Sequence, residues 1–204
     1  MENINQKQEE ILVAAKKVFE NFGYKKTTLD DVAAQLTISR TALYYYYKNK
    51  DALFLALSQY ELNKYEQELK NAINACSTIE EMLVAFCKCF LPKRKQFREI
   101  YKLDPEESTL PFAIQKKIKS MNNAIHINIL TTIFKNDKKI SQLSNLGYFM
   151  TILTYSIRGI VFSSFGVTAK QLENDMLSFF KIFYNGLLYI ISENSAHRNS
   201  KDKL

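Results

Sequence analysis

Apolar residues recur every three or four positions along most of this 204-residue chain, which is the spacing of one face of an α-helix. In residues 27–50 two short faces of this kind follow each other closely, and they consist of Leu29, Val32, Ala33 and Leu36, then Leu43 and Tyr47. Between them stands Ile38, an apolar residue that can pack against both. We therefore predict two short helices joined by a tight turn.

Hydroxyl residues stand where each of these helices should begin. Thr28 precedes the first helix and is followed three residues later by Asp31, an arrangement that caps a helix N-terminus. Ser39 precedes the second helix in the same way. The outward face of the second helix then carries hydrogen-bond donors and flat rings, namely Arg40, Thr41, Tyr44 and Tyr45. This pattern is typical of a helix-turn-helix, whose second helix enters the major groove of DNA.

The chain around these two helices follows a longer and more specific pattern. It reads ILVAAKKVFENFGYKKTTLDDVAAQ over residues 11–35 and SRTALYYYYKNKDAL over residues 39–53. These segments resemble the N-terminal domain of the tetracycline-repressor (TetR-like) family of bacterial transcriptional regulators. The resemblance implies an all-α protein with a three-helix helix-turn-helix DNA-binding domain in residues 1–50. A larger helical domain for effector binding and dimerisation would follow in residues 51–193, and residues 194–204 would form a polar, disordered tail.

The resemblance also implies which side chains meet double-stranded DNA. The matching positions are Thr27, Thr28, Ser39, Arg40, Thr41, Tyr44, Tyr45, Tyr46, Lys48 and Lys50. Residues at helix starts would hold phosphate groups, and the row of tyrosines would contact the DNA backbone and thymine methyl groups. Arg40 is our candidate base reader, because a guanidinium can donate to both O6 and N7 of guanine. The alternative for the tyrosine row is packing, which we expect for Tyr47 because it shares the face of Leu43.

The sequence departs from the family pattern at two positions. Thr37 stands where the family usually has the glycine that ends the first motif helix. Because a β-branched residue resists positive φ, we expect this turn to close in a different conformation. Thr41 stands where a glycine is common, so this face would lie slightly further from DNA or read a thymine methyl group.

Further helices are predicted before and after the motif. A first helix carries an apolar stripe and should end at Gly23 as a left-handed cap; the stripe is formed by Ile11, Leu12, Ala15, Val18, Phe19 and Phe22. A fourth helix should run from near Lys50 to about Cys76. The pair Thr78 and Glu81 forms a capping box for a helix that Pro92 should end. Later helices are expected over residues 112–134, 141–165 and 168–193.

The last two predicted helices are apolar over most of their circumference. One monomer of this size cannot bury both sides of each helix, so we expect a homodimer that packs these two helices from each subunit together. The TetR-like resemblance implies the same arrangement. Dimerisation also suits DNA recognition, because two helix-turn-helix domains bound to a near-palindrome specify more base pairs than one domain does.

In this family the second domain encloses a small molecule whose binding releases DNA. The candidate interior polar groups here are Tyr101, His126, Tyr155 and Arg158, although a buried polar group of this kind more often has a purely structural partner. The effector itself is not identified by the sequence. A basic run over residues 93–103 has three interpretations: a solvated face, a surface that faces DNA, or a site for an anionic effector.

Composition bears on which other kinds of protein this chain could be. The net charge of +7 lies mostly outside the motif, since residues 1–55 contribute +1, so charge alone is weak evidence for DNA binding. Two histidines and the absence of any glycine-rich phosphate loop or metal-ligand spacing argue against an enzyme, a metal site or a cofactor. An odd set of three cysteines, Cys76, Cys87 and Cys89, suggests reduced, buried thiols, with redox sensing by the last two as the alternative.

The predicted location is the cytoplasm, because no signal peptide is visible and the apolar residues 146–167 contain polar groups and Arg158. We expect no membrane partner. By resemblance, the expected function is that of a homodimeric, effector-released repressor. The alternative is an effector-independent architectural or cell-division factor that binds DNA and a protein partner.

Overall fold

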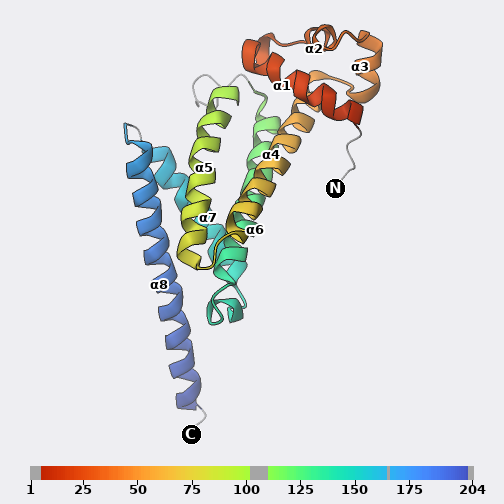
Figure 1. The fold of residues 1–204 in the computed structure, drawn as a ribbon. Coiled ribbons are helices and arrows are strands. Elements are labelled where there is room, and N and C mark those ends of the chain that lie inside the picture. Colours follow the sequence, from red (N-terminus) through yellow and green to blue (C-terminus); the bar gives the residue numbers. More distant parts are fainter. Residues whose placement is uncertain (1–5, 102–109, 165, 202–204) are drawn as a thin grey trace. The chain divides into compact units, whose positions relative to one another are not determined.

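The computed structural model describes residues 6–101, 110–164 and 166–201, and the side chains within them apart from residues 94–101 and 194–201. The regular structure of these residues is helical, which confirms the all-α prediction. In chain order the elements are α1 (Gln6–Lys26), α2 (Leu29–Gln35), α3 (Arg40–Tyr46), α4 (Lys50–Asn74), α5 (Ile79–Tyr101), α6 (Phe112–Phe134), the 3-10 turn η1 (Ile140–Gln142), α7 (Leu146–Ser163) and α8 (Ala169–Lys201) (Figure 1).

The chain divides into two compact units that are not contiguous in sequence. Unit 1 comprises Met1–Glu66 and Lys93–Asn122, and unit 2 comprises Gln67–Pro92 and Asn123–Leu204. Helices α4, α5 and α6 therefore each contribute one part to unit 1 and the other part to unit 2. The domain boundary predicted after residue 50 lies inside unit 1, at the start of α4.

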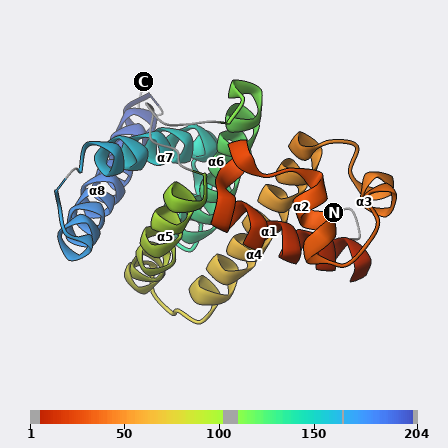
Figure 2. The same cartoon turned by 90° about the horizontal axis from the view of Figure 1, so that it is seen from above.

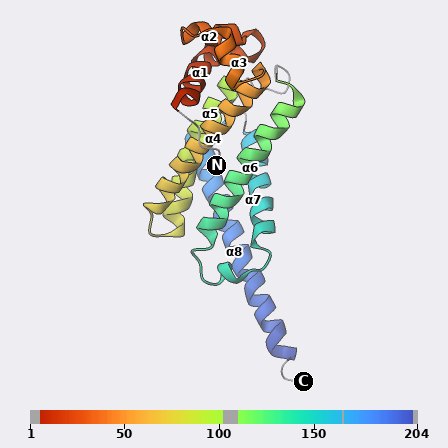
Figure 3. The same cartoon turned by 90° about the vertical axis from the view of Figure 1, so that its right-hand side faces the viewer.

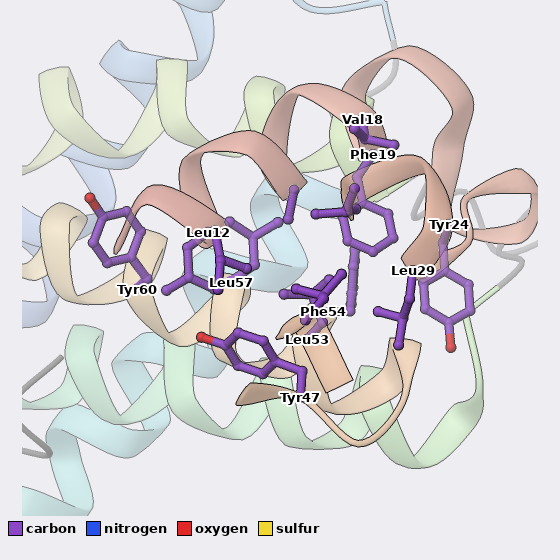
Figure 4. Packing of buried hydrophobic residues seen from close by; sticks show 14 of the residues in the cluster. Leu12, Val18, Phe19, Tyr24, Leu29, Tyr47, Leu53, Phe54, Leu57 and Tyr60 are labelled. Atoms are coloured by element: carbon purple, nitrogen blue, oxygen red, sulfur yellow. The ribbon is translucent and has the colours of Figure 1, made fainter. Parts of the chain in front are cut away.

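The core of unit 1 forms between α1 and the first half of α4. The buried side of α1 includes Leu12, Val18 and Phe19, which pack around Leu53, Phe54 and Leu57 of α4 (Figure 4). The ring of Phe54 meets the rings of Phe19 and Tyr24 edge-on, with centroids 4.9 and 5.0 Å apart. Further chain segments complete this core with Leu110, Ile114 and Ile118. The α1 stripe was thus predicted correctly over most of its length.

The end of α1 differs from the prediction. Phe22 is 57% exposed, whereas Tyr24 is buried in the core. Between them Gly23 has the predicted positive φ of 72°, but its ψ of 169° is extended and not that of a left-handed helical cap. This conformation reorients the chain so that Tyr24, and not Phe22, stacks against Phe19. The turn is closed by Thr27, whose hydroxyl donates to the Gly23 carbonyl at 2.8 Å.

Unit 2 contains a second apolar core. Its buried residues come from the first part of α5, the second part of α6, α7 and α8, and they include Phe86, Phe134, Met150, Leu153, Met176 and Phe180. The predicted capping box begins α5: the Glu81 carboxylate accepts from the backbone N–H of Thr78 at 3.1 Å, and the Thr78 hydroxyl accepts from that of Glu81 at 3.2 Å.

Three predicted helix boundaries were wrong. Helix α5 continues through Pro92 to Tyr101. The fixed φ of proline is compatible with a helix, although the residue removes one hydrogen bond and crowds the carbonyl four positions earlier. Helix α7 begins at Leu146 and not at Ser141, because the Asp137 carboxylate accepts from the N–H groups of Lys139 and Ile140 and holds the chain in a separate turn.

The third wrong boundary is the C-terminal end of the last helix. Helix α8 runs on to Lys201, beyond the end of α7 (Figure 3), so residues 194–201 are helical and not the disordered tail that we expected. A helix that has already nucleated extends at little cost, even through polar residues.

Candidate nucleic-acid interface

Helix α2 begins with the predicted capping box. The Thr28 hydroxyl accepts from the backbone N–H of Asp31 at 3.2 Å, and the Asp31 carboxylate accepts from the backbone N–H of Thr28 at 2.7 Å. The hydrogen bonds from Thr28 also lower the pKa of Asp31, because they stabilise its ionised form. Leu29, Val32 and Ala33 are buried, as predicted, which fixes α2 on the core.

The turn after α2 contradicts our expectation for Thr37. Its φ is 55°, so this β-branched residue does adopt the left-handed conformation. The reason is the pattern of hydrogen bonds at the end of α2: Thr37 N–H donates to the Ala34 carbonyl and Ile38 N–H to the Ala33 carbonyl, both at 3.1 Å. This pattern is a Schellman motif, in which the first residue after the helix cap, here Thr37, has a positive φ. The hydrogen bonds to these two carbonyls and the partial burial of Ile38 offset the strain of the left-handed conformation at Thr37.

Helix α3 is held by one apolar face and one cap. The Ser39 hydroxyl accepts from the backbone N–H of Ala42 at 3.1 Å, and Leu43 and Tyr47 are buried in the core, as predicted. Helices α2 and α3 lie next to each other, joined by the turn at Thr37 (Figures 1 and 2). The structure therefore confirms the predicted pair of short helices.

The outward face of α3 is accessible. Arg40, Thr41, Tyr44 and Tyr45 are exposed, with Tyr45 reaching 85%. Tyr46 is half-buried, and its ring meets that of Tyr45 edge-on with centroids 5.2 Å apart. Lys48, just beyond the helix, is also exposed.

Arg40 makes three contacts on this face, with two residues. Its Nη1 atom lies 3.1 Å from Oδ2 of Asp30, and its Nη2 atom donates to the Tyr44 hydroxyl at 3.1 Å. The guanidinium carbon also lies 5.2 Å from the centre of the Tyr44 ring. Asp30 belongs to α2, ten positions before Arg40, so no local sequence pattern indicated this pair.

Two of the other predicted contact residues already have internal partners. Thr27 is buried and its hydroxyl bonds to Gly23, so the exposed Thr28 is the better placed of the two threonines. The Lys50 ammonium donates to the carbonyls of Tyr24 and Lys25, at 2.9 and 3.3 Å, and lies over the Tyr24 ring. Lys50 therefore ties the start of α4 to the end of α1.

An ion cluster that sequence reasoning missed joins three helices of unit 1. The buried Glu61 carboxylate of α4 lies 2.7 Å from the Lys16 ammonium of α1 and 3.8 Å from the Lys93 ammonium of α5. These residues are far apart in the sequence, and each alone reads as an ordinary surface charge. The cluster fixes α1, on which the motif packs, to the longer helices of the unit.

The candidate effector residues do not share one environment. His126 is buried against the rings of Phe86 and Phe90, and burial, aided by the charge of Arg158, lowers its pKa to about 4. Arg158 is half-buried and donates to the Asn123 side-chain oxygen at 2.6 Å. Tyr155 is 57% exposed, so its assignment as an interior group was wrong: it lies on the outer side of α7. The Tyr101 side chain lies outside the described residues.

Of the three free cysteines, Cys87 is buried and Cys76 and Cys89 are partly buried. Burial raises the pKa of the Cys87 thiol to about 12, with a smaller contribution from Glu173, and burial also raises the pKa of Cys89. Among the residues that the structure describes, no group of three or more His, Cys, Asp or Glu side chains could hold a metal ion. Of the described helices, α7 alone is long and apolar enough by composition to cross a membrane, a test that core helices of soluble proteins also pass.

A comparison with known families decides the nature of the motif. The model described as "Bacterial regulatory proteins, tetR family" matches residues 11–57, which span α2, α3 and the core positions that support them. The chain carries a TetR-family DNA-binding domain. The chain is also similar to the HTH-type transcriptional regulator QacR of Staphylococcus aureus, with 24% identity over 188 residues, 88% of this chain and 97% of QacR.

Solved structures of regulators share the fold. A transcriptional regulator from Cytophaga hutchinsonii has a TM-score of 0.70 at 20% identity, covering 89% of this chain and 98% of that one. AibR, solved in complex with isovaleryl coenzyme A and operator DNA, has a TM-score of 0.55 at 18% identity, covering 85% and 97%. The protein is thus a TetR-like transcriptional regulator with a DNA-binding helix-turn-helix.

Proposed function

We propose that this protein is a cytoplasmic, homodimeric repressor that binds a near-palindromic operator and is released from it by a small-molecule effector. The observation that carries the DNA-binding part is the exposed face of α3. It presents donors and aromatic rings on a helix whose opposite face is locked into the core by Leu43 and Tyr47. A rigid recognition helix is what base reading in the major groove requires.

The contacts divide by chemistry. Thr28, Ser39, Lys48 and Lys50 would bind phosphate and set the position of the motif on the duplex. Arg40 would read guanine, and Thr41, Tyr44 and Tyr45 would contact thymine methyl groups or the sugar-phosphate backbone. Lys50 would bind phosphate with the one N–H donor of its ammonium group that does not bond to the carbonyls of Tyr24 and Lys25.

The apolar surface of α7 and α8 supports the homodimer. Large apolar or aromatic side chains on these helices are exposed in the single chain: Tyr148, Ile152, Tyr155, Phe162, Ile182, Tyr189 and Ile190. A surface of this kind is unfavourable in water and marks an interface. A second copy of the chain would cover it and pair the two recognition helices for a two-fold symmetric site.

The effector would act through the helices that the two units share. Since α4, α5 and α6 each run through both units, a ligand that shifts these helices in unit 2 can change unit 1, which holds the motif. His126 and Arg158 are the candidate ligand contacts. That AibR was crystallised with both a coenzyme A thioester and operator DNA supports a regulator of this type.

Selection of bound sequences from random duplex DNA, followed by binding measurements over a salt series, tests the proposal. We expect a near-palindrome that is strongly preferred over random DNA. Binding without a consensus and with a steep salt dependence would contradict it and favour the effector-independent architectural factor.

The mutations Arg40→Ala and Lys48→Ala then separate the assigned roles. The first should abolish preference at one base position, whereas the second should weaken binding to all sequences alike and reduce the salt slope by about one. Equal loss at every base for Arg40→Ala would refute its assignment as the base reader.

A further inference from the structure

A carboxylate lies on the very surface that is proposed to face DNA. Asp30, in the first turn of α2, pairs with Arg40, in the first turn of α3, and both side chains are more than half exposed. An acid at this place opposes the approach of a polyanion. Its presence on the recognition surface therefore needs an explanation other than affinity.

The dipole of α2, the helix that carries Asp30, does not supply that explanation. An acid in a first helical turn is favoured by the helix dipole, but in α2 this place is already taken by Asp31, which also forms the capping box. Helix α3 shows the reverse situation: its first turn contains no acid and begins with Arg40, a cation where the dipole disfavours one. Asp30 offsets that unfavourable charge.

The geometry around Arg40 restricts the guanidinium. Asp30 binds Nη1 from one side, and the Tyr44 hydroxyl accepts from Nη2, one turn along α3. A guanidinium has five N–H donors in a rigid plane, so donors remain that can meet a base edge. A side chain that is already oriented loses less conformational freedom when it binds.

We propose that Asp30 is a specificity-determining residue of this surface, because it holds Arg40 and cancels its charge. The inference rests on the proposed DNA-binding function. On random DNA, the neutralised Arg40 adds little attraction to phosphate, and the Asp30 carboxylate repels the backbone. A guanine at the correct position offers O6 and N7 to the oriented guanidinium, so the guanine contact forms while the general attraction stays low.

The test compares the wild-type chain with Asp30→Asn on the selected operator and on random duplex DNA over a salt series. We expect Asp30→Asn to bind random DNA about three- to tenfold more tightly, with a salt slope steeper by about one charge. Preference for the guanine that Arg40→Ala identifies should fall about tenfold. Asp30→Glu, which keeps the carboxylate, should restore most of that preference.

Glu20→Gln is the matched control, because Glu20 is exposed on α1 and its replacement removes the same charge from the same unit. It should alter neither the random-DNA affinity nor the base preference. Circular dichroism would verify that each variant is folded.

The outcomes separate the two proposals. If the wild type prefers its operator and Asp30→Asn strengthens binding to both DNAs equally, or changes nothing, the role of Asp30 is overturned and the DNA-binding function stands. If the wild type shows no preference for any sequence, both proposals fail. If Asp30→Asn lowers the guanine preference and Asp30→Glu restores it, the carboxylate beside Arg40 sets specificity.

Discussion

The buried His126 should make the stability of this protein depend on pH in a predictable direction. Burial among aromatic rings lowers its pKa from 6.5 to about 4. Between these two pH values the imidazole is protonated in the unfolded chain and neutral in the folded chain. The stability that the neutral imidazole contributes is fully present above pH 6.5 and is lost as the pH falls toward 4. Its full size, taken from the shift, is about 3 kcal/mol.

The magnitude at an accessible pH follows from the same two pKa values. At pH 5 the unfolded histidine is almost fully protonated while the folded one is mostly neutral, which corresponds to a loss of about 2 kcal/mol relative to pH 7. We expect urea denaturation of the wild type to show this loss in addition to that caused by other groups. The variant His126→Gln retains those other groups and cannot titrate at this position, so its loss should be about 2 kcal/mol smaller.

This comparison is valid even if His126→Gln is less stable than the wild type at pH 7. For each protein it uses only the change in the free energy of unfolding between pH 7 and pH 5. The variant His197→Gln controls for the second histidine of the chain. Equal losses for the wild type and His126→Gln would refute the reasoning and would mean that His126 is protonated in the folded protein.

Three further predictions concern backbone strain, the buried ion cluster and the dimer. Replacing Thr37, whose φ is 55°, with glycine should relieve left-handed strain and raise the free energy of unfolding by about 0.5–1 kcal/mol after the entropy of the unfolded glycine is subtracted, as thermal and urea melts would measure. Glu61→Gln should lower it by about 2 kcal/mol, less than for a fully buried pair because the Lys16 side chain keeps 27% exposure. Phe162→Glu should shift a homodimer toward monomer in sedimentation velocity, because it places a charge on the exposed apolar side of α7.

Each of these predictions has a matched comparison. Gly23→Ala, at a φ of 72° with open space around a Cβ atom, should destabilise the protein where Thr37→Gly stabilises it. Glu20→Gln removes an exposed carboxylate from unit 1 and should leave stability nearly unchanged. Phe22→Glu alters another exposed phenylalanine, outside α7 and α8, so a loss of dimer in both glutamate variants would show that the effect is not specific to the proposed interface.

Local signals in the sequence were sufficient for much of the fold. The capping residues Thr28, Ser39 and Thr78 were found correctly because a cap involves only neighbouring backbone groups. The inward positions Leu43 and Tyr47 followed from helical spacing, and the predicted bounds of α6 agree with the structure.

Features that depend on distant groups or on competing energies were missed. Intrinsic preference argued against positive φ at Thr37, but the two hydrogen bonds that close α2 outweigh that preference. The partners of Arg40 and Glu61 lie on other helices, where periodicity carries no information. Burial of Tyr24 in place of Phe22 depends on the extended ψ of Gly23, which no spacing rule predicts.

The core of unit 1 limits how this regulator can be divided or recombined. Leu110, Ile114 and Ile118, more than fifty residues beyond the motif, fill part of the core that supports it. A fragment cut after residue 50 would lose Leu53, Phe54 and Leu57 as well and expose the apolar side of α1 to water. A chimaera that exchanges DNA specificity with a relative should therefore carry over residues 93–122 together with residues 1–66. The DNA-reading head is in this sense an assembly of two chain segments, and its evolution is tied to that of helices which also belong to unit 2.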